Sequence, residues 1–324
     1  MNSDQNSGKT GLVFDEIFLR HRTTPGHPER PERLVAIRDS LQATGLWEKL
    51  QPIPVRPADR EVVELVHEPH YIDRVAALAE NGGGFLDSPD TPICRDSFHV
   101  ALCAVGGLIE AADRILTGSI HNAFAAIRPP GHHALPDRAM GFCLFNNVAI
   151  VARYLQRRHG LERILIVDWD VHHGNGTQAI FYDDPTVLYF SVHQYPFYPG
   201  TGSRQERGWG DGLGLTINAP VPAGTDEETW LSTFRQHLLP ALEHFQPDFV
   251  LISAGFDAHE MDLLGGLGVT TEGYAEATRL IKEIADRHAK GRLLSALEGG
   301  YHLGALGASV AAHVAVLMHP PGPS

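Results

Sequence analysis

Hydrophobic and polar positions follow two different periods along this chain. Short, continuous apolar runs rich in β-branched residues are typical of strands buried on both faces of a parallel sheet. Seven such runs predict strands over residues 11–15, 123–127, 164–167, 187–191, 213–218, 249–253 and 292–297. Apolar residues at helical spacing predict helices over residues 33–41, 62–79 with a break near Pro69, 97–116, 147–154, 177–181, 227–245, 272–289 and 306–317.

This alternation of strands and helices predicts an α/β fold with a mainly parallel sheet and helices on both of its faces. No Pro/Ser-rich linker interrupts it, so we expect one domain over residues 10–320, after a disordered polar segment over residues 1–9. The glycines of residues 81–84 are expected to break the helical pattern before a loop over residues 86–92. The prolines of residues 27–33 delay the first helix, and one interpretation of this charged loop is a solvated, salt-bridged helix entry.

The most informative polar residues follow the strand over residues 164–167. Asp168, Asp170 and His172 alternate along an extended backbone, so their side chains leave on the same side, within reach of one ion. The acidic residues could instead cap the next helix. However, two carboxylates in an apolar setting need protons or a positive partner. Because oxygen and nitrogen ligands suit zinc, and catalytic zinc sites use three protein ligands, the pattern favours a metal site with a further ligand elsewhere.

Three other strands end in similar chemistry. The strand over residues 249–253 is followed by Asp257, which we interpret as the missing ligand. His132 and His133 stand behind a stiff Pro-Pro-Gly turn, and Tyr301 follows two glycines after the last strand. Because ligands bind at the carboxyl ends of parallel strands, these side chains are expected at one edge of the sheet.

Together these residues are sufficient for amide hydrolysis. A divalent ion lowers the pKa of bound water and polarises a carbonyl oxygen. A neutral histidine can accept the proton of the water, and a histidine can protonate the departing amine. Asp168, if it is not a ligand, could orient one histidine, and Tyr301 could donate a hydrogen bond to the oxyanion.

Composition and charge restrict the binding partners and the cellular location that we expect. The formal net charge of −13 argues against direct binding of nucleic acid, and no apolar run has the length of a membrane span. Cys94, Cys103 and Cys143 show no CxxC spacing, so a reducing, cytoplasmic location is expected. The pattern leaves open whether the chain forms a homo-oligomer.

Five motifs resemble the zinc-dependent histone deacetylase and acetylpolyamine amidohydrolase superfamily, in its class II-like bacterial type. They are Arg-Pro-Pro-Gly-His-His over residues 128–133, Gly-Phe-Cys over 141–143, Asp-x-Asp-x-His-His-Gly-Asn-Gly over 168–176, Ser-Ala-Gly-Phe-Asp over 253–257 and Glu-Gly-Gly-Tyr over 298–301. The resemblance extends from His27 to the last helix. It implies an arginase-like α/β/α sandwich around an eight-stranded, mainly parallel sheet.

The resemblance also implies roles for single residues. Zn²⁺ would be bound by Asp170, His172 and Asp257, with His132 and His133 at the attacking water and Tyr301 as the catalytic tyrosine. Asp168 would pair with His132, and Asn175 with His133. Many members have Asp in place of Asn175, so the basicity of His133 should differ here. A structural K⁺ is implied near Asp168, Asp170, His172 and Ser191.

The family's substrate channel would be lined by Gly141, Phe142, His173 and Tyr198, with Leu264 near the mouth and Asp90 at the rim. A narrow aromatic slot suits a long methylene stem, as in an acyl-lysine peptide or protein. Small acetylated amines such as acetylpolyamines also fit. However, polyamine-specific relatives carry Glu where this chain has Leu264, which favours acyl-lysine.

Other functions remain open from the sequence alone. A binuclear manganese ureohydrolase would need a second set of ligands bridging two ions, and the matching acidic positions are missing. A non-catalytic acyl-binding protein would not need Tyr301 and both histidines. Iron is an alternative to zinc, because oxygen and nitrogen ligands accept several divalent ions.

Overall fold

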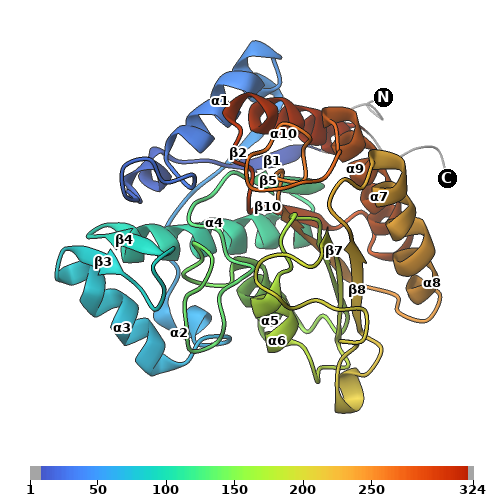
Figure 1. The fold of residues 1–324 in the computed structure, drawn as a ribbon, viewed down its shortest axis with the longest axis horizontal. Coiled ribbons are helices and arrows are strands. Elements are labelled where there is room, and N and C mark those ends of the chain that lie inside the picture. Colours follow the sequence, from blue (N-terminus) through green and yellow to red (C-terminus); the bar gives the residue numbers. More distant parts are fainter. Residues whose placement is uncertain (1–8, 320–324) are drawn as a thin grey trace.

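An eight-stranded sheet forms the centre of the computed structural model, which describes residues 9–319 (Figure 1). The strand order is β2-β1-β5-β10-β9-β6-β7-β8, and every neighbouring pair is parallel. The strands are β1 (Thr10–Val13), β2 (Gln51–Ile53), β5 (Asn122–Ala125), β6 (Ile164–Asp168), β7 (Val187–Gln194), β8 (Thr216–Val221), β9 (Phe249–Ala254) and β10 (Leu293–Leu297).

Helices cover both faces of this sheet. The long ones are α1 (Glu32–Ala43), α3 (Pro69–Glu80), α4 (Ser97–Leu116), α5 (Asn147–His159), α9 (Thr271–His288) and α10 (Leu303–Met318). The short ones are α2 (Arg60–Val63), α6 (Asn175–Ile180), α7 (Glu227–Thr233) and α8 (Leu239–Leu242). Helices α1, α10, α9 and α7 pack in one group and α4 with α5 in another, and Figure 1 shows the two groups on opposite sides of the sheet. The predicted α/β/α sandwich is therefore confirmed.

Seven of the eight strands lie where the apolar runs predicted them, although several ends differ. The pattern missed β2, which has only three residues with Pro52 in the middle and lies at the edge of the sheet. An edge strand tolerates proline because one side of its backbone needs no partner. Its pairing with β1 is therefore a tertiary contact that local periodicity does not report.

Two other expectations were wrong in part. The helix predicted over residues 227–245 is divided into α7, a π-helical turn (Phe234–Leu238) and α8, and it ends at Leu242. Residues 81–84 end the helical pattern as expected, because α3 ends at Glu80, but they also contain the start of strand β3 (Gly83–Phe85), which pairs antiparallel with β4 (Pro92–Cys94). The loop over residues 86–92 is therefore the connection of a hairpin.

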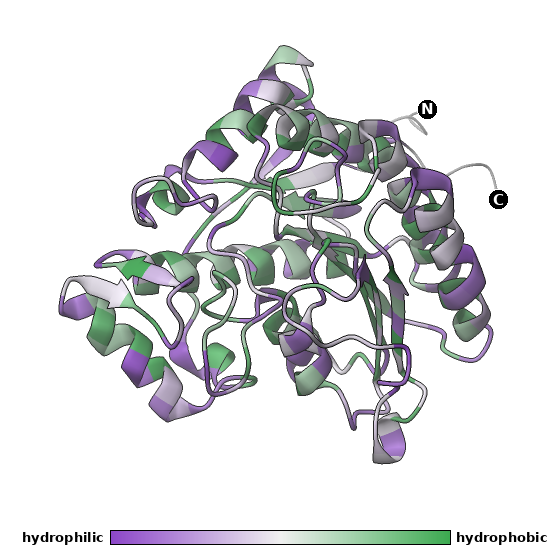
Figure 2. Ribbon diagram, in the orientation of Figure 1, coloured by the Kyte–Doolittle hydropathy of each residue, from purple (hydrophilic) through white to green (hydrophobic). Residues whose placement is uncertain are grey.

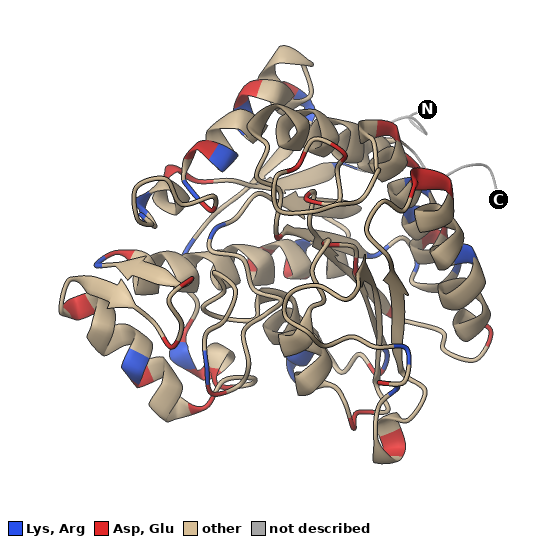
Figure 3. Cartoon of the chain, in the orientation of Figure 1, with Lys and Arg blue, Asp and Glu red and all other residues tan. Residues whose placement is uncertain are grey.

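Apolar side chains of the strands and inner helix faces form the core. Figure 2 shows hydrophobic residues concentrated in the sheet, and Figure 3 shows charged residues of both signs mainly on the outer helices and loops. The strand residues of β5, β6, β7, β9 and β10 are all buried. Within residues 9–319, no helix combines the length and apolarity that crossing a bilayer requires. The expected disorder of the N-terminus concerns residues that, except for Lys9, lie outside those described.

Candidate active site

Four adjacent strands deliver the predicted site residues to one rim. His132 and His133 follow β5, Tyr301 follows β10, Asp257 follows β9, and Asp170 and His172 follow β6. These strands are neighbours in the sheet and all run parallel, so their carboxyl ends meet at the same edge. The structure therefore brings these residues together as their positions after the strands predicted.

Asp170, His172 and Asp257 form a compact group of two carboxylates and one imidazole. The Nδ1 atom of His172 lies 3.0 Å from Oδ1 of Asp170 and 3.2 Å from Oδ2 of Asp257. One ligand atom from each residue lies within 4.8 Å of the other two. The Oδ2 atom of Asp257 is buried without a hydrogen-bond partner. An orphaned carboxylate oxygen beside two further oxygen and nitrogen ligands fits a divalent cation such as zinc.

The protein's own groups leave this cluster holding protons. Burial raises the pKa of Asp257 to about 7. Burial alone would lower the pKa of His172, but the hydrogen bond to Asp170 and the charges of Asp170 and Asp257 outweigh it and raise this pKa to about 10. A cation would have to displace these protons, because metal ligands bind in their deprotonated forms.

Two glycines make room for the carboxylates. A Cβ atom at Gly255 would collide with Asp170, and one at Gly299 would collide with both Asp257 and Asp170. The N–H of Gly299 donates to Oδ2 of Asp170 over 2.8 Å, and the N–H of Val171 donates to Oδ1 of Asp257 over 2.9 Å. The backbone thus orients each carboxylate and leaves Oδ2 of Asp257 free.

The paired histidines lie beside this group, with ring centroids 4.0 Å apart. Nδ1 of His132 lies 3.0 Å from Oδ2 of Asp168, which also accepts a hydrogen bond from the hydroxyl of Tyr189. Nδ1 of His133 lies 2.8 Å from Oδ1 of Asn175. Asp168 is therefore placed to orient His132, and it is not one of the three clustered ligands.

The two histidines differ in their affinity for protons. Burial alone would lower the pKa of His132, but the charges of Asp168 and Asp170 raise it to about 10. Burial, with the nearby charges of His132 and His172, holds the pKa of His133 well below its usual range. The arrangement thus combines a proton-holding imidazole with a neutral one.

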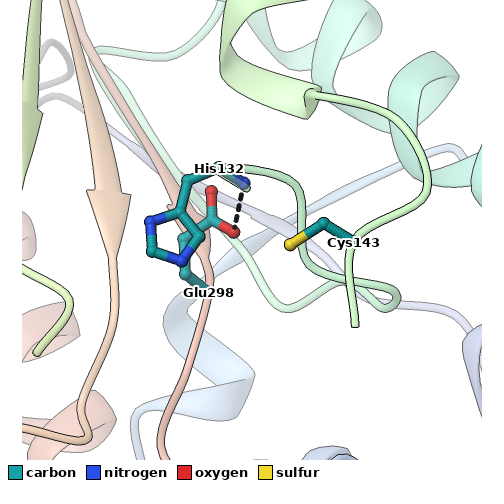
Figure 4. Close-up of side chains that lie close together, drawn as sticks. All are labelled: His132, Cys143 and Glu298. Atoms are coloured by element: carbon teal, nitrogen blue, oxygen red, sulfur yellow. Dashed lines mark hydrogen bonds between the residues drawn. The ribbon is translucent and has the colours of Figure 1, made fainter. Parts of the chain in front are cut away.

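A second buried cluster consists of His132, Cys143 and Glu298 (Figure 4). Unlike Asp257, its carboxylate is satisfied within the protein. Oε2 of Glu298 accepts the N–H groups of Gly131 and His132, and Oε1 accepts the hydroxyl of Ser253. The thiol of Cys143 donates to the carbonyl oxygen of Gly141. These bonds fix the loop that carries the paired histidines, so we assign this cluster a structural role.

A pocket of about 480 Å³ leads to the site. It is lined by Asp90, His133, Gly141, Phe142, His172, Gln194, Phe197, Tyr198, Leu263, Leu264, Gly265, Gly266 and Tyr301. Every expected channel residue except His173 is among them. His173 is fully buried, with its ring nitrogens against Thr201 and Gln178, so the structure corrects its expected place in the channel wall.

Other residues near the site were not found from the sequence. The pocket is also lined by Gln194, Phe197 and Leu263. The hydrophobic and polar periodicity of the sequence did not mark these positions. Asp262 accepts the N–H groups of Tyr301 and His302, which fixes the backbone at the tyrosine. The glycines before Tyr301 indicated only that the backbone bends there, and no sequence signal identified Asp262.

The loop over residues 27–33 is not the solvated helix entry that was considered. Glu29 and Arg33 are fully buried. Arg33 donates to the carbonyl oxygens of Gly300 over 2.6 Å and of Glu298 over 2.5 Å, and its guanidinium lies 4.9 Å from the ring centroid of Tyr301. The loop therefore supports the strand end that carries the tyrosine.

Comparison with known proteins gives a consistent result. The histone deacetylase domain matches residues 27–317. A probable deacetylase of Archaeoglobus fulgidus is 45% identical over 294 residues, which are 90% of this chain and 81% of the relative. A histone deacetylase-like amidohydrolase of Pseudomonas aeruginosa is 38% identical over 311 residues, or 90% and 82% of the two chains. The crystal structure of the HDA15 HD domain matches with a TM-score of 0.92 and 39% identity, over 97% of this chain and 90% of that one.

Proposed function

Because this chain belongs to the histone deacetylase family, we propose that it hydrolyses the amide bond of N-acetyl-lysine or a similar N-acylated amine, releasing a carboxylate and a free amine. The observation that carries this proposal is the convergence of Asp170, His172 and Asp257 beside the paired histidines, below a pocket that Tyr301 also lines. The sequence relatives named deacetylase and amidohydrolase support the same reaction type.

In this proposal Asp170, His172 and Asp257 hold one Zn²⁺. The ion would supply Lewis acidity, which polarises the substrate carbonyl and acidifies water. The donor set supports this assignment because it offers two carboxylates and one imidazole, with one carboxylate oxygen unpartnered. Iron remains the alternative ion, because the same ligands accept it.

The protein's own groups then provide the proton transfers. The Nδ1–H group of His133 donates a hydrogen bond to Oδ1 of Asn175. The Nε2 atom is therefore free to accept a proton from the attacking water and to transfer it to the departing amine. His132, protonated beside Asp168, stabilises negative charge that develops on the substrate. Burial raises the pKa of Tyr301 well above its ordinary value, so its hydroxyl stays a hydrogen-bond donor for the oxyanion.

For the substrate we propose an acyl-lysine peptide or protein. The aromatic walls, Phe142 and Tyr198, suit a methylene stem, and Asp90 at the rim can accept a hydrogen bond from a substrate amide. Leu264 offers no charge to the distal ammonium of a polyamine. We therefore favour acyl-lysine over acetylpolyamines.

Two subsidiary proposals follow from the same family. A structural K⁺ would be held near Asp168, Asp170, His172 and Ser191; Asp168 and Ser191 are paired in the β6–β7 register. We also propose a cytoplasmic location, since all three cysteines are free thiols.

The decisive experiment compares turnover of acetyl-lysine peptides, acetylpolyamines and a guanidino substrate by the zinc-loaded chain. Tyr301→Phe should lower kcat roughly a hundredfold or more while substrate binding is retained, because it removes one oxyanion donor. Tyr154→Phe is the matched control, since that hydroxyl bonds Asp113 on a surface helix. Unchanged kcat in Tyr301→Phe would refute the role of this tyrosine. Two bound ions per chain with guanidino turnover would instead indicate a ureohydrolase.

A further inference from the structure

One buried hydroxyl connects two separate walls of the pocket. Thr91 lies in the hairpin connection between β3 and β4 and is fully buried. Its Oγ1 atom donates to Oδ1 of Asp90 over 3.0 Å and accepts the backbone N–H of Phe142 over 3.2 Å. Asp90 and Phe142 both line the pocket, whereas Thr91 does not. The hydroxyl thus holds two lining residues from behind.

Phe142 has an unusual backbone conformation, within a turn that Met140 and Cys143 close by backbone hydrogen bonds. Its φ angle is +69°, a left-handed value that residues with a Cβ atom rarely adopt. Its ring lies edge-on to His27, with centroids 4.6 Å apart, and edge-on to Tyr301, with centroids 5.9 Å apart. The backbone angle at Phe142 therefore decides where one wall of the slot stands relative to the tyrosine.

The carboxylate of Asp90 is fixed by three hydroxyl groups, one of which is that of Thr91. Its Oδ1 atom accepts the hydroxyls of Ser88 and Thr91, and its Oδ2 atom accepts the hydroxyl of Tyr198 over 3.3 Å. Tyr198 forms part of the pocket wall, so the carboxylate joins the hairpin to a second wall. The hydroxyl of Ser88 bonds Asp90 and also lies 3.1 Å from the hydroxyl of Thr91, but it makes no hydrogen bond to Phe142. Only Thr91 therefore links Asp90 directly to Phe142.

We propose that Thr91 is a positioning residue that sets the width of the substrate slot, by tying the turn that carries Phe142 to the β3–β4 hairpin and by holding Asp90 against Tyr198. The inference rests on the proposed deacylation, because the slot is taken as the channel for the acyl-lysine stem. Without the hydroxyl, the turn that carries Phe142 loses its link to the hairpin, and this wall of the pocket shifts. The stem then binds less well, while the groups at the scissile amide remain in place.

The test uses three variants of the full, zinc-loaded chain. Thr91→Val removes the hydroxyl at nearly constant shape, and Thr91→Ser keeps it. Ser88→Ala removes a hydroxyl that bonds Asp90 and Thr91 but leaves the hydrogen bond between Thr91 and Phe142. For an acetyl-lysine peptide, Thr91→Val should raise KM about tenfold with kcat within about threefold, since one lost hydrogen bond of this kind is worth up to about a factor of ten. Thr91→Ser should stay within about twofold of the wild type, and Ser88→Ala within about threefold.

Amide hydrogen exchange provides a readout that does not depend on turnover. The exchange rate at Phe142 should rise about tenfold or more in Thr91→Val and stay near the wild-type value in Thr91→Ser and Ser88→Ala. If Thr91→Val does not fold, Thr91→Ala takes its place. A wild-type KM and a wild-type exchange rate at Phe142 in the hydroxyl-free variant would overturn the proposal. An equal rise of KM and of this exchange rate in Thr91→Ser would also overturn it.

The two proposals fail in distinguishable ways. If the wild-type chain with zinc turns over no acylated amine, the proposed function is wrong and the exchange rates alone decide the role of Thr91. If turnover is present but Thr91→Val lowers kcat and thermal stability without changing KM, the threonine is structural and the inference is wrong while the function stands.

Discussion

Two groups of buried charges lie near Tyr301, and their charges are balanced by different means. On one side, Glu29 accepts hydrogen bonds from Arg128 and Arg33, and all three side chains are fully buried. On the other side, Asp170 and Asp257 share the imidazole of His172, and Asp170 also lies 3.8 Å from that of His132. Within residues 9–319, no lysine or arginine forms an ion pair with either carboxylate. The single carboxylate of the first group is compensated by two arginines of the chain, whereas the two carboxylates of the second group need protons or a cation.

The difference shows how burial alone fails to identify a functional site. Burial would raise the pKa of Glu29, but Arg128 outweighs it and holds this pKa well below its usual range. Burial and the charge of Asp170 raise the pKa of Asp257 to about 7, and the neighbouring His172 lowers it too little to offset them. An uncompensated carboxylate group is the feature that distinguishes the proposed metal site from a structural ion pair. Four experiments can break or sharpen this comparison.

The largest effect is expected from Glu29→Gln. This change leaves Arg128 and Arg33 buried without a counter-charge, which should lower the free energy of unfolding by about 3–5 kcal/mol. Urea denaturation of the wild type and the variant measures it. Glu64→Gln is the control, since its exposed pair with Arg60 should contribute no more than about 1 kcal/mol. An equal decrease of the free energy of unfolding in the two variants would show that the buried network stabilises the fold no more than an exposed ion pair.

The second-largest effect is expected from Asp257→Asn, and it concerns the free energy of zinc binding. Zinc binding should weaken about a hundredfold or more, because even the hydrogen-bond partners of metal ligands contribute 10- to 100-fold to affinity. Competition with a chromophoric chelator measures this affinity. Asp248→Asn, which affects a carboxylate that bonds the N–H groups of Glu162 and Arg163, should bind zinc normally. Zinc affinity within threefold of the wild type in Asp257→Asn would rule out this ligand.

The pH dependence of the two groups should have opposite signs. In the chelator-treated chain, the pKa values of Asp257 (about 7) and His172 (about 10) lie above their unfolded values of 3.8 and 6.5. The folded chain then binds extra protons, and this contribution to stability is lost as pH rises through the folded values. Glu29, with a lowered pKa, contributes stability above its unfolded value of 4.5 and loses it only in acid.

Zinc titrations between pH 6 and 9 measure this difference. Zinc affinity should increase with pH, by up to about tenfold per pH unit for each proton displaced. Chelator-treated protein should lose stability over the same range by up to about 1.4 kcal/mol per pH unit and proton. An affinity independent of pH would mean that the site holds no displaceable protons.

The smallest effect is expected from Asn175→Asp. The new carboxylate would lie at Nδ1 of His133, now 2.8 Å from the amide oxygen, and should raise the lowered pKa of this histidine. The acid limb of the kcat/KM profile should move to higher pH by about one unit, with little change in stability. Asn218→Asp is the control, because Asn218 bonds Gln178 and Glu206 away from the pocket. An unmoved acid limb would argue against His133 as the proton acceptor.

Most of the fold could be predicted because its strands are local apolar runs. The limits appear where tertiary contacts override the pattern: β2 is held by pairing with β1, and β3 forms within a glycine run because it pairs with β4. His173 shows the same limit within a motif. It adjoins His172, but successive side chains point in different directions, and this one is buried against Gln178 and Thr201.

By itself, the sequence determined that this chain forms a parallel α/β sheet and that Asp170, His172, Asp257, Tyr301 and the paired histidines meet at one edge. The physical reason is that each residue follows a strand, and the carboxyl ends of parallel strands share an edge. Only the tertiary structure decided which carboxylates are compensated. Arg33 lies 267 positions from Gly300 in the chain, and its contact there depends on packing between distant segments, which no local period records.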